Sequence, residues 1–186
     1  MFKPNTERLL DYWRARRGGR PAPRRVEIDV ADFPSLAPQV FIAEAQPGGD
    51  VRFRLAGERV AALSGRPLRG ESLLSLWAAE HRGRLSRLLT SALATPEPLV
   101  VLASARPADA SAADAQADGV ELRFEWMFAP LAGPYGALDR FLGLCQPEPG
   151  PSARAGALRI VAVNGVADAA RRAPLRLAAL DGRRIA

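Results

Sequence analysis

The chain has 186 residues, of which 48% are hydrophobic and 25% are charged, so it can form one globular domain with a buried core. Its apolar runs are far shorter than the ~20 residues that a membrane span needs, and charged residues stand early where a secretory signal would be apolar. The single cysteine excludes an internal disulfide and a cysteine-rich zinc site, and a cytoplasmic location is expected.

The net charge of +6 is unevenly distributed along the chain. Residues 1–25 carry +6 and residues 150–186 carry +5, whereas residues 26–149 carry −5. Basic ends can contact RNA, anionic lipid or an acidic protein surface. However, 25 of the 26 basic residues are arginine and alanine is abundant, which indicates compositional bias more than selection for phosphate contacts. Binding of nucleic acid or an anionic membrane through these termini is therefore the alternative function.

The first predicted element is a helix that begins at Asn5 or Thr6 and ends near Arg17, before two glycines. Its apolar side chains recur at helical spacing and form one face: Leu9, Leu10 and Trp13. An isolated helix of this length is marginal in water, so the face must be covered. We expect it to dock on the domain's own sheet or on a second chain, which makes these three residues the candidate interaction site.

A β-hairpin is predicted from residues 39–46 and 51–56, which are joined by a Pro-Gly-Gly-Asp turn. Before it, Phe33–Leu36 is predicted to form a single helical turn that ends before Pro38. After it, two short helices are predicted at about 58–64 and 71–77.

A longer helix is predicted from about Ala79 to Leu93, with four leucines at helical spacing facing the core: Leu85, Leu88, Leu89 and Leu93. Three strands follow, at 99–106, 120–131 and 138–146. In the second of these, apolar side chains alternate with charged ones, which places a set of them on one sheet face: Leu122, Phe124, Trp126 and Phe128.

The composition changes after Pro147, where proline, glycine, alanine and arginine dominate. Residues 157–165 are expected to form a short edge strand or to lie against the domain, and the chain beyond Pro149 is expected to add little stability. The predicted organisation is a helix and basic loop at 1–25, a domain at 26–148 and a basic tail at 149–186. The fold class is α+β, with a five-stranded antiparallel sheet, helices on one face and, in addition, an N-terminal flanking helix.

Four segments in this order resemble one family: TERLLDYWRARRGGRPAPRR, DFPSLAPQVFIAE, FRLAG and SGRPLRGESLLSLW. Together they make residues 6–147 similar to the bacterial PAS-like family known as PAS_5 or DUF1457. The resemblance implies a PAS fold, in which helices and sheet enclose a cup, and a cytoplasmic regulatory role. It implies no catalytic residue.

The cup suggests a ligand site lined by apolar residues, for which the candidates are Phe53, Leu74, Trp77, Phe124 and Trp126. The competing interpretation is that these residues are ordinary core, as aromatic residues at strand spacing commonly are. His81 is considered as a haem ligand and Cys145 as a redox or adduct-forming thiol, but the first is a lone histidine among charges and the second follows Leu144 in a strand. No metal site is predicted, and the sequence leaves the cofactor unknown.

Catalytic motifs are missing from the sequence, which has no second histidine, no Gly-x-Ser-x-Gly elbow and no phosphate-binding loop. We therefore expect a non-enzymatic, stand-alone sensory or regulatory module. It is expected to act through a protein partner or through self-association of its N-terminal helix, with a small-molecule pocket as a further option.

Overall fold

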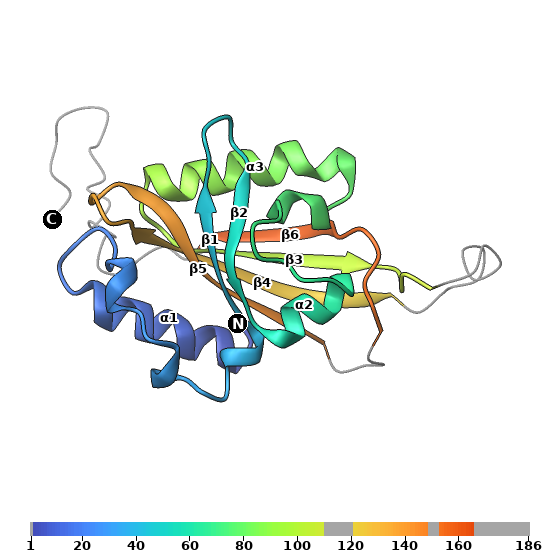
Figure 1. The fold of residues 1–186 in the computed structure, drawn as a ribbon, viewed down its shortest axis with the longest axis horizontal. Coiled ribbons are helices and arrows are strands. Elements are labelled where there is room, and N and C mark those ends of the chain that lie inside the picture. Colours follow the sequence, from blue (N-terminus) through green and yellow to red (C-terminus); the bar gives the residue numbers. More distant parts are fainter. Residues whose placement is uncertain (1, 110–120, 149–152, 166–186) are drawn as a thin grey trace, which may run out of the picture.

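The computed structural model describes residues 2–109, 121–148 and 153–165 (Figure 1). Its centre is a six-stranded sheet in the order β2-β1-β5-β4-β3-β6, in which every neighbouring pair is antiparallel. The strands are β1 (Val40–Ala45), β2 (Val51–Ala56), β3 (Leu99–Ala105), β4 (Leu122–Ala132), β5 (Leu138–Pro147) and β6 (Arg159–Gly165).

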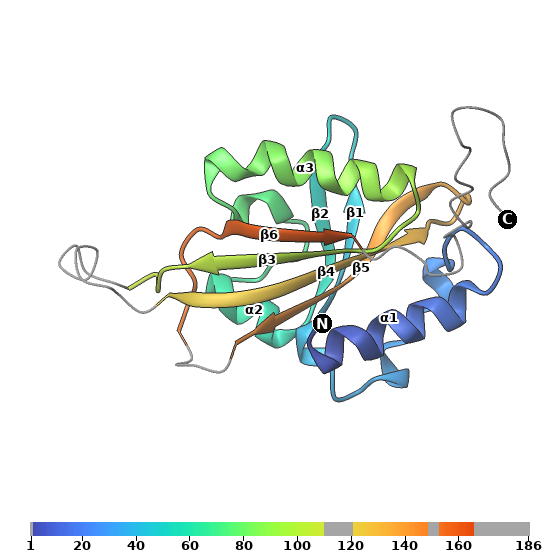
Figure 2. The ribbon, with the colours of Figure 1, turned by 180° about the vertical axis from the view of Figure 1, so that it is seen from behind.

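Helices cover both faces of this sheet (Figures 1 and 2). The α-helices are α1 (Pro4–Arg17), α2 (Glu58–Ser64) and α3 (Ala79–Ala94). The 3₁₀ turns are η1 (Arg25–Glu27), η2 (Val30–Asp32), η3 (Ala37–Gln39) and η4 (Leu73–Leu76). The positions of all three α-helices agree with the sequence prediction to within two residues.

The connection before β1 differs from its prediction. The helical turn expected to end before Pro38 is followed instead by η3, which contains Pro38 near its start. Proline is accepted there because the first N–H groups of a helical turn have no partner within it. Pro38 therefore lies within a 3₁₀ turn, whereas the sequence predicted that a helical turn would end before it.

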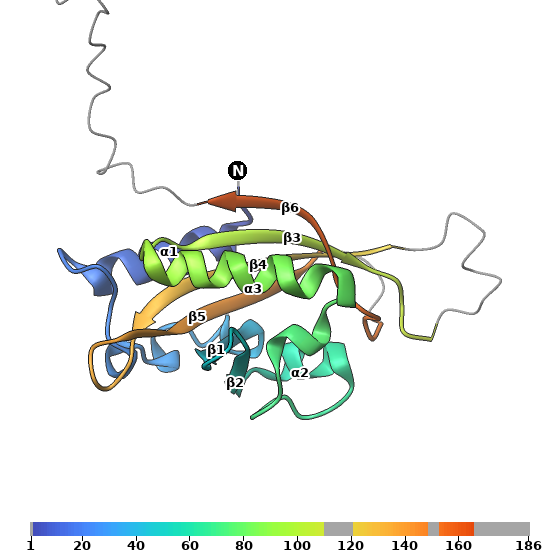
Figure 3. The same ribbon diagram turned by 90° about the horizontal axis from the view of Figure 1, so that it is seen from above.

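The prediction of five strands was wrong, because β6 adds a sixth strand at the edge of the sheet beside β3 (Figure 3). Ile160 of β6 and Leu158 just before it are buried. The edge-strand option for residues 157–165 is thus the observed one, and part of the segment assigned to the basic tail completes the domain. Residues 166–186, and residues 110–120 between β3 and β4, lie outside the described residues.

The buried side chains form two clusters, one on each face of the sheet. We call the side covered by α2, η4 and α3 the cup face, and its largest fully buried side chains are Phe41, Phe53, Trp77, Trp126, Phe128 and Phe141. We call the other side the α1 face, where α1 and residues 22–36 cover mainly aliphatic side chains. β4 alternates between the two clusters, since Trp126 and Phe128 belong to the cup face and Met127 belongs to the α1 face.

Candidate functional site

The cup face is occupied by interlocking aromatic rings. Phe41 is at the centre, with its ring centroid 5.5 Å from those of Phe53 and Trp126 and 5.6 Å from that of Phe128. The ring centroid of Trp77, which follows η4, lies 5.8 Å from that of Trp126. Geometries of this kind, tilted or edge-to-face, are the favourable ones for aromatic pairs. The chain's own side chains therefore pack the centre of the cup.

Gly143 on β5 shows how tightly the cup face is packed. It pairs with Phe41 of β1, and a Cβ atom added at this position would lie 2.0 Å from Cζ of the Phe41 ring. The ring thus lies directly over the backbone of β5, where only glycine leaves room for it.

The structure brings the five predicted ligand-contacting residues together. Phe53, Trp77, Phe124 and Trp126 are buried in the cup-face cluster, and the half-buried Leu74 packs against it. Their contacts are those of a hydrophobic core, as the competing interpretation held. Whether any of them contacts a ligand stays a prediction.

Two indole groups give this apolar cluster a polar component. Nε1 of Trp77 and Nε1 of Trp126 are buried and have no hydrogen-bond partner among the described residues. A buried indole N–H usually finds an acceptor, so these two groups are unsatisfied hydrogen-bond donors of the cup face among the described residues.

Neither candidate for cofactor chemistry fits the cup. Cys145 is buried on β5 opposite Trp126, and burial raises the pKa of its thiol well above the usual range, so the reactive thiolate is disfavoured. His81 is half-buried in the first turn of α3 and is not part of the cup-face cluster. Among the described residues, no three His, Cys, Asp or Glu side chains gather to hold a metal ion. The residues present do not match a haem or flavin-adduct site.

The three candidate interaction residues are buried within the chain itself. Leu9, Leu10 and Trp13 pack on the α1 face, and Trp13 Nε1 donates a 2.7 Å hydrogen bond to the carbonyl of Pro130 in β4. Of the two options left open by the sequence, docking on the domain's own sheet is the observed one. A partner could reach these three side chains only if α1 left the sheet.

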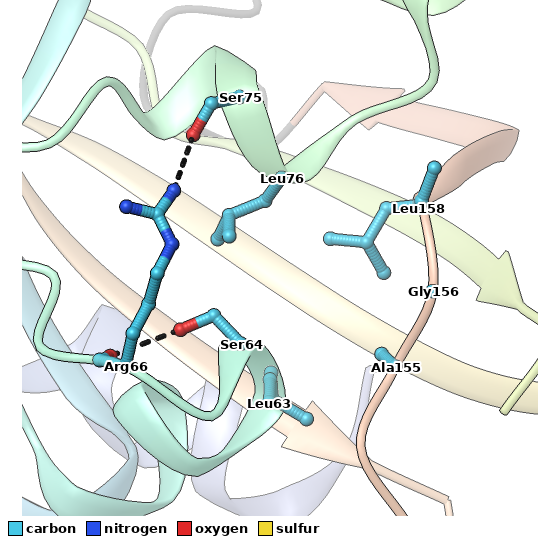
Figure 4. Close-up of a pocket in the computed structure, with 9 residues that line it drawn as sticks. Leu63, Ser64, Arg66, Ser75, Leu76, Ala155, Gly156 and Leu158 are labelled. Atoms are coloured by element: carbon cyan, nitrogen blue, oxygen red, sulfur yellow. Dashed lines mark hydrogen bonds between the residues drawn. The ribbon is translucent and has the colours of Figure 1, made fainter. Parts of the chain in front are cut away.

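An open pocket of about 280 Å³ lies outside the aromatic cluster (Figure 4). Its lining comes from the end of α2, from Arg66, from η4 and from the segment that leads into β6: Leu63, Ser64, Arg66, Ser75, Leu76, Ala155, Gly156, Ala157 and Leu158. Sequence reasoning missed this pocket because it assigned the 153–158 segment to the tail. Nothing in the local sequence signals that these distant segments meet.

A second feature that the sequence did not reveal is a pair of exposed apolar side chains, Tyr135 at 99% exposure and Val26 at 82%. Tyr135 lies in the β4–β5 turn and Val26 in η1. These two segments are joined because Ala132 N–H donates a 2.9 Å hydrogen bond to the carbonyl of Pro23.

The family model of a PAS domain, PAS_5, matches residues 1–146. The chain belongs to this family. PAS domains are sensory and regulatory modules, so the chain carries a module of that class. Its membership also agrees with the mixed α/β architecture and the antiparallel sheet.

Among solved structures, the chain is similar to an RNA-binding light-oxygen-voltage receptor, with 16% sequence identity and a TM-score of 0.41. The alignment covers 67% of this chain and 35% of the receptor chain, so the match spans about a third of that protein's length. A comparison with curated proteins finds no significant match. Within the described part of the chain, no helix has the length and apolar character to cross a membrane.

Proposed function

We propose that the chain is a regulatory PAS module that acts by binding another protein and catalyses no reaction. The observation that carries this proposal is the packed cup face, where the rings of Phe41, Trp77 and Trp126 contact one another. A cup filled in this way supports a role in protein contacts more than one as a chamber for a resident cofactor. The cup then acts as the core that holds the surface of the module in place.

The surface best suited to a partner lies at the C-terminal end of α1. Tyr135 and Val26 each stand three residues from the hydrogen bond that joins Ala132 to Pro23, and both expose apolar area there. Arg20 binds Glu27 in the same loop at 2.8 Å, which fixes the loop against the end of the helix. Exposed tyrosine is a common energetic centre of protein interfaces because it offers a large rigid surface.

This location keeps the N-terminal helix in the interaction, as the sequence suggested, but changes the side chains involved. The apolar face of α1 stabilises the domain, while the end of the helix and the adjoining β4–β5 turn offer the contact surface. Self-association through the same surface is one form that the interaction can take.

Binding of nucleic acid or anionic lipid is less well supported at this end of the chain. Three arginines in and after α1 already form ion pairs: Arg14 with Asp11, Arg16 with Asp32 and Arg20 with Glu27. Phosphate contacts would have to compete with these carboxylates, and they would weaken steeply as salt concentration rises.

The proposal is tested by affinity purification of the tagged full chain from its own host, followed by cross-linking and mass spectrometry. We compare the parent with the double variant Tyr135→Ser, Val26→Ser and with the control Val161→Ser, which changes an exposed valine on β6. We expect a stoichiometric protein partner, or a second copy, that the control retains and the double variant loses. Recovery of RNA in place of protein, with a strong dependence on salt, would favour the alternative function.

A further inference from the structure

The open pocket has one charged wall and one apolar wall. In Figure 4 the Arg66 side chain stands on one side and points toward Ser75, while Ala155 and Leu158 stand on the other. Leu63 and Leu76 contribute apolar surface between the two walls. The pocket volume of about 280 Å³ is close to the lower end of the ~300–1,000 Å³ range of small-molecule sites. It therefore suits a small ligand with an apolar body and a polar end.

The guanidinium of Arg66 is only partly engaged. Nη1 donates a 2.5 Å hydrogen bond to Glu71, whereas Nη2 makes only a long 3.5 Å contact with the hydroxyl of Ser75. The hydroxyls of Ser64 and Ser75 donate to backbone carbonyls, at 3.0 Å and 2.7 Å. Arg66 is thus the main charged donor for a ligand in this pocket. Of its two terminal nitrogens, Nη2 makes the weaker hydrogen bond and is the one more easily directed to a ligand.

We propose that this pocket binds a small amphiphilic monocarboxylate, with its carboxylate on Arg66 and its hydrocarbon part against Leu63, Leu76 and Leu158. The site goes beyond the proposed function, because protein binding at the α1 end does not require it. A charge-assisted hydrogen bond from arginine to a carboxylate is stronger than the long contact to Ser75 that it would replace.

A carboxylate fits the local charge better than a phosphate does. Glu71 stays beside Arg66 and repels an anionic ligand, and this repulsion is greater for a phosphate that carries up to two negative charges. The apolar walls also favour a ligand with a hydrocarbon part over an inorganic anion.

The pocket lies beside the segment that leads into the edge strand β6, so a ligand there can affect how that segment docks on the domain. We define the strap as residues 153–158, the described segment that leads into β6. Ala155 N–H donates to the carbonyl of Leu63 at 3.0 Å, and Leu158 N–H donates to that of Leu76 at 2.9 Å. A ligand between the strap and Arg66 contacts both sides of this junction. It should therefore stabilise the strap in its docked position by mass action.

In the experiment, the full isotopically labelled chain is titrated separately with hexanoate, with its neutral analogue hexanamide and with inorganic phosphate. NMR chemical shifts measure binding in each titration. It uses Arg66→Gln, which removes the charge, Glu71→Gln, which removes the competing carboxylate, and the control Arg84→Gln on the exposed side of α3. Hydrogen exchange of the Ala155 and Leu158 amides reports on the strap.

We expect hexanoate to bind the parent about tenfold or more tightly than hexanamide, a ratio that corresponds to one charge-assisted interaction. Arg66→Gln should remove that preference, Glu71→Gln should increase hexanoate affinity several-fold, and Arg84→Gln should change neither. Hexanoate should also slow exchange of the two strap amides. Because the Glu71 and Arg66 variants move affinity in opposite directions, general destabilisation cannot account for the pattern.

Equal binding of hexanoate and hexanamide to the parent would overturn the proposal, as would an unchanged preference in Arg66→Gln. Tighter binding of phosphate than of hexanoate would overturn the carboxylate assignment. None of these results bears on protein binding at Tyr135, so failure of this site and failure of the proposed function are distinguishable.

Discussion

The two faces of the sheet differ in the side chains that pack on them and in how their buried tryptophans are bonded. The cup face consists of stacked and tilted rings, and two of its indole N–H groups have no partner among the described residues. The α1 face is aliphatic, and hydrogen bonds over long sequence distances fix its helix to the sheet. In addition to the Trp13 bond, Gln146 Nε2 donates to the hydroxyl of Thr6 at 2.7 Å, and Lys3 N–H donates to Glu125 at 3.1 Å.

This difference separates two roles within one domain. Directional bonds determine where α1 lies, because moving the helix would leave buried polar groups unpaired. On the cup face the two tryptophan N–H groups have no such partner among the described residues, and the hydrogen bonds to the sheet come from other groups, such as the Gly70 N–H, which donates to the carbonyl of Phe53 at 2.7 Å. We therefore expect the loss of a tryptophan hydrogen bond to matter on the α1 face and the loss of ring contacts to matter on the cup face.

The largest expected effect is at the centre of the cup face. Trp126 is fully buried and contacts Phe41, Trp77 and Phe128, so Trp126→Ala should lower the free energy of unfolding by about 3–5 kcal/mol. Chemical denaturation measures this, with the exposed Tyr135→Ala as the control that should change little. A Trp126 variant as stable as the parent would mean that the ring packing is not the core of the domain.

The strap contributes Leu158 to the edge of the cup-face cluster. Leu158 is 2% exposed and belongs to the cup-face cluster, so Leu158→Ala should cost about 2–5 kcal/mol. Val161→Ala on β6, where the side chain is exposed, is the matched control. If both changes have equally small effects on the free energy of unfolding, the result would support the sequence-based expectation that the chain beyond Pro149 contributes little to stability.

A pair of matched variants compares the faces directly. Trp13→Phe and Trp77→Phe remove the same atoms from fully buried positions. Within the described part of the chain, only the first change removes a hydrogen bond, the one to Pro130. Trp13→Phe should therefore be the more destabilising by about 1–3 kcal/mol, the cost of leaving a buried acceptor unpaired. If Trp77→Phe costs as much, its indole N–H has an acceptor outside the described residues.

The smallest effect concerns the loop that follows α1. Arg20 donates two hydrogen bonds to Glu27, and these, with the backbone N–H of Arg24, lower the pKa of that carboxyl from 4.5 to about 2. Because the folded-state pKa is lowered, the stabilisation is present above pH 4.5 and disappears as the pH falls toward 2. The parent should melt at a slightly higher temperature than Glu27→Gln at neutral pH.

That advantage over Glu27→Gln should vanish between pH 4.5 and pH 2, as followed by thermal unfolding monitored by circular dichroism. Arg69→Gln, a change at an exposed arginine beyond α2, serves as the control for loss of a surface charge. A difference between parent and Glu27→Gln that does not depend on pH would contradict the role of this ion pair.

Most of the fold could be predicted from local patterns in the sequence. The alternation from Leu122 to Phe128 and the helical spacing of Leu85 and Leu89 each require only neighbouring residues, and both faces were assigned correctly. The sequence does not decide whether β6 pairs with the sheet, because an edge strand next to a glycine- and proline-rich segment gives a weak local signal. Its place in the sheet depends on pairing with β3, more than fifty residues earlier.

The sites were harder to predict than the fold. Phe53 and Trp126 were correctly grouped, but sequence alone cannot distinguish side chains that line a cavity from those that fill it. Leu9, Leu10 and Trp13 were correctly identified as an apolar face, but their partner could not be chosen between the chain's own sheet and another chain. The Arg66 pocket depends on the meeting of three distant segments, which no local pattern encodes.

The chain's own aromatic rings pack the centre of the cup, and this packing is the basis for the proposal that the module holds no resident cofactor. The most direct test is native mass spectrometry of the full protein purified from its own host, together with its absorption spectrum. We predict a mass that the polypeptide accounts for by itself, alone or as a complex with a protein partner or second copy, and no visible absorption band. A stoichiometric haem, flavin or other cofactor that is lost when Trp126 is changed would contradict this account.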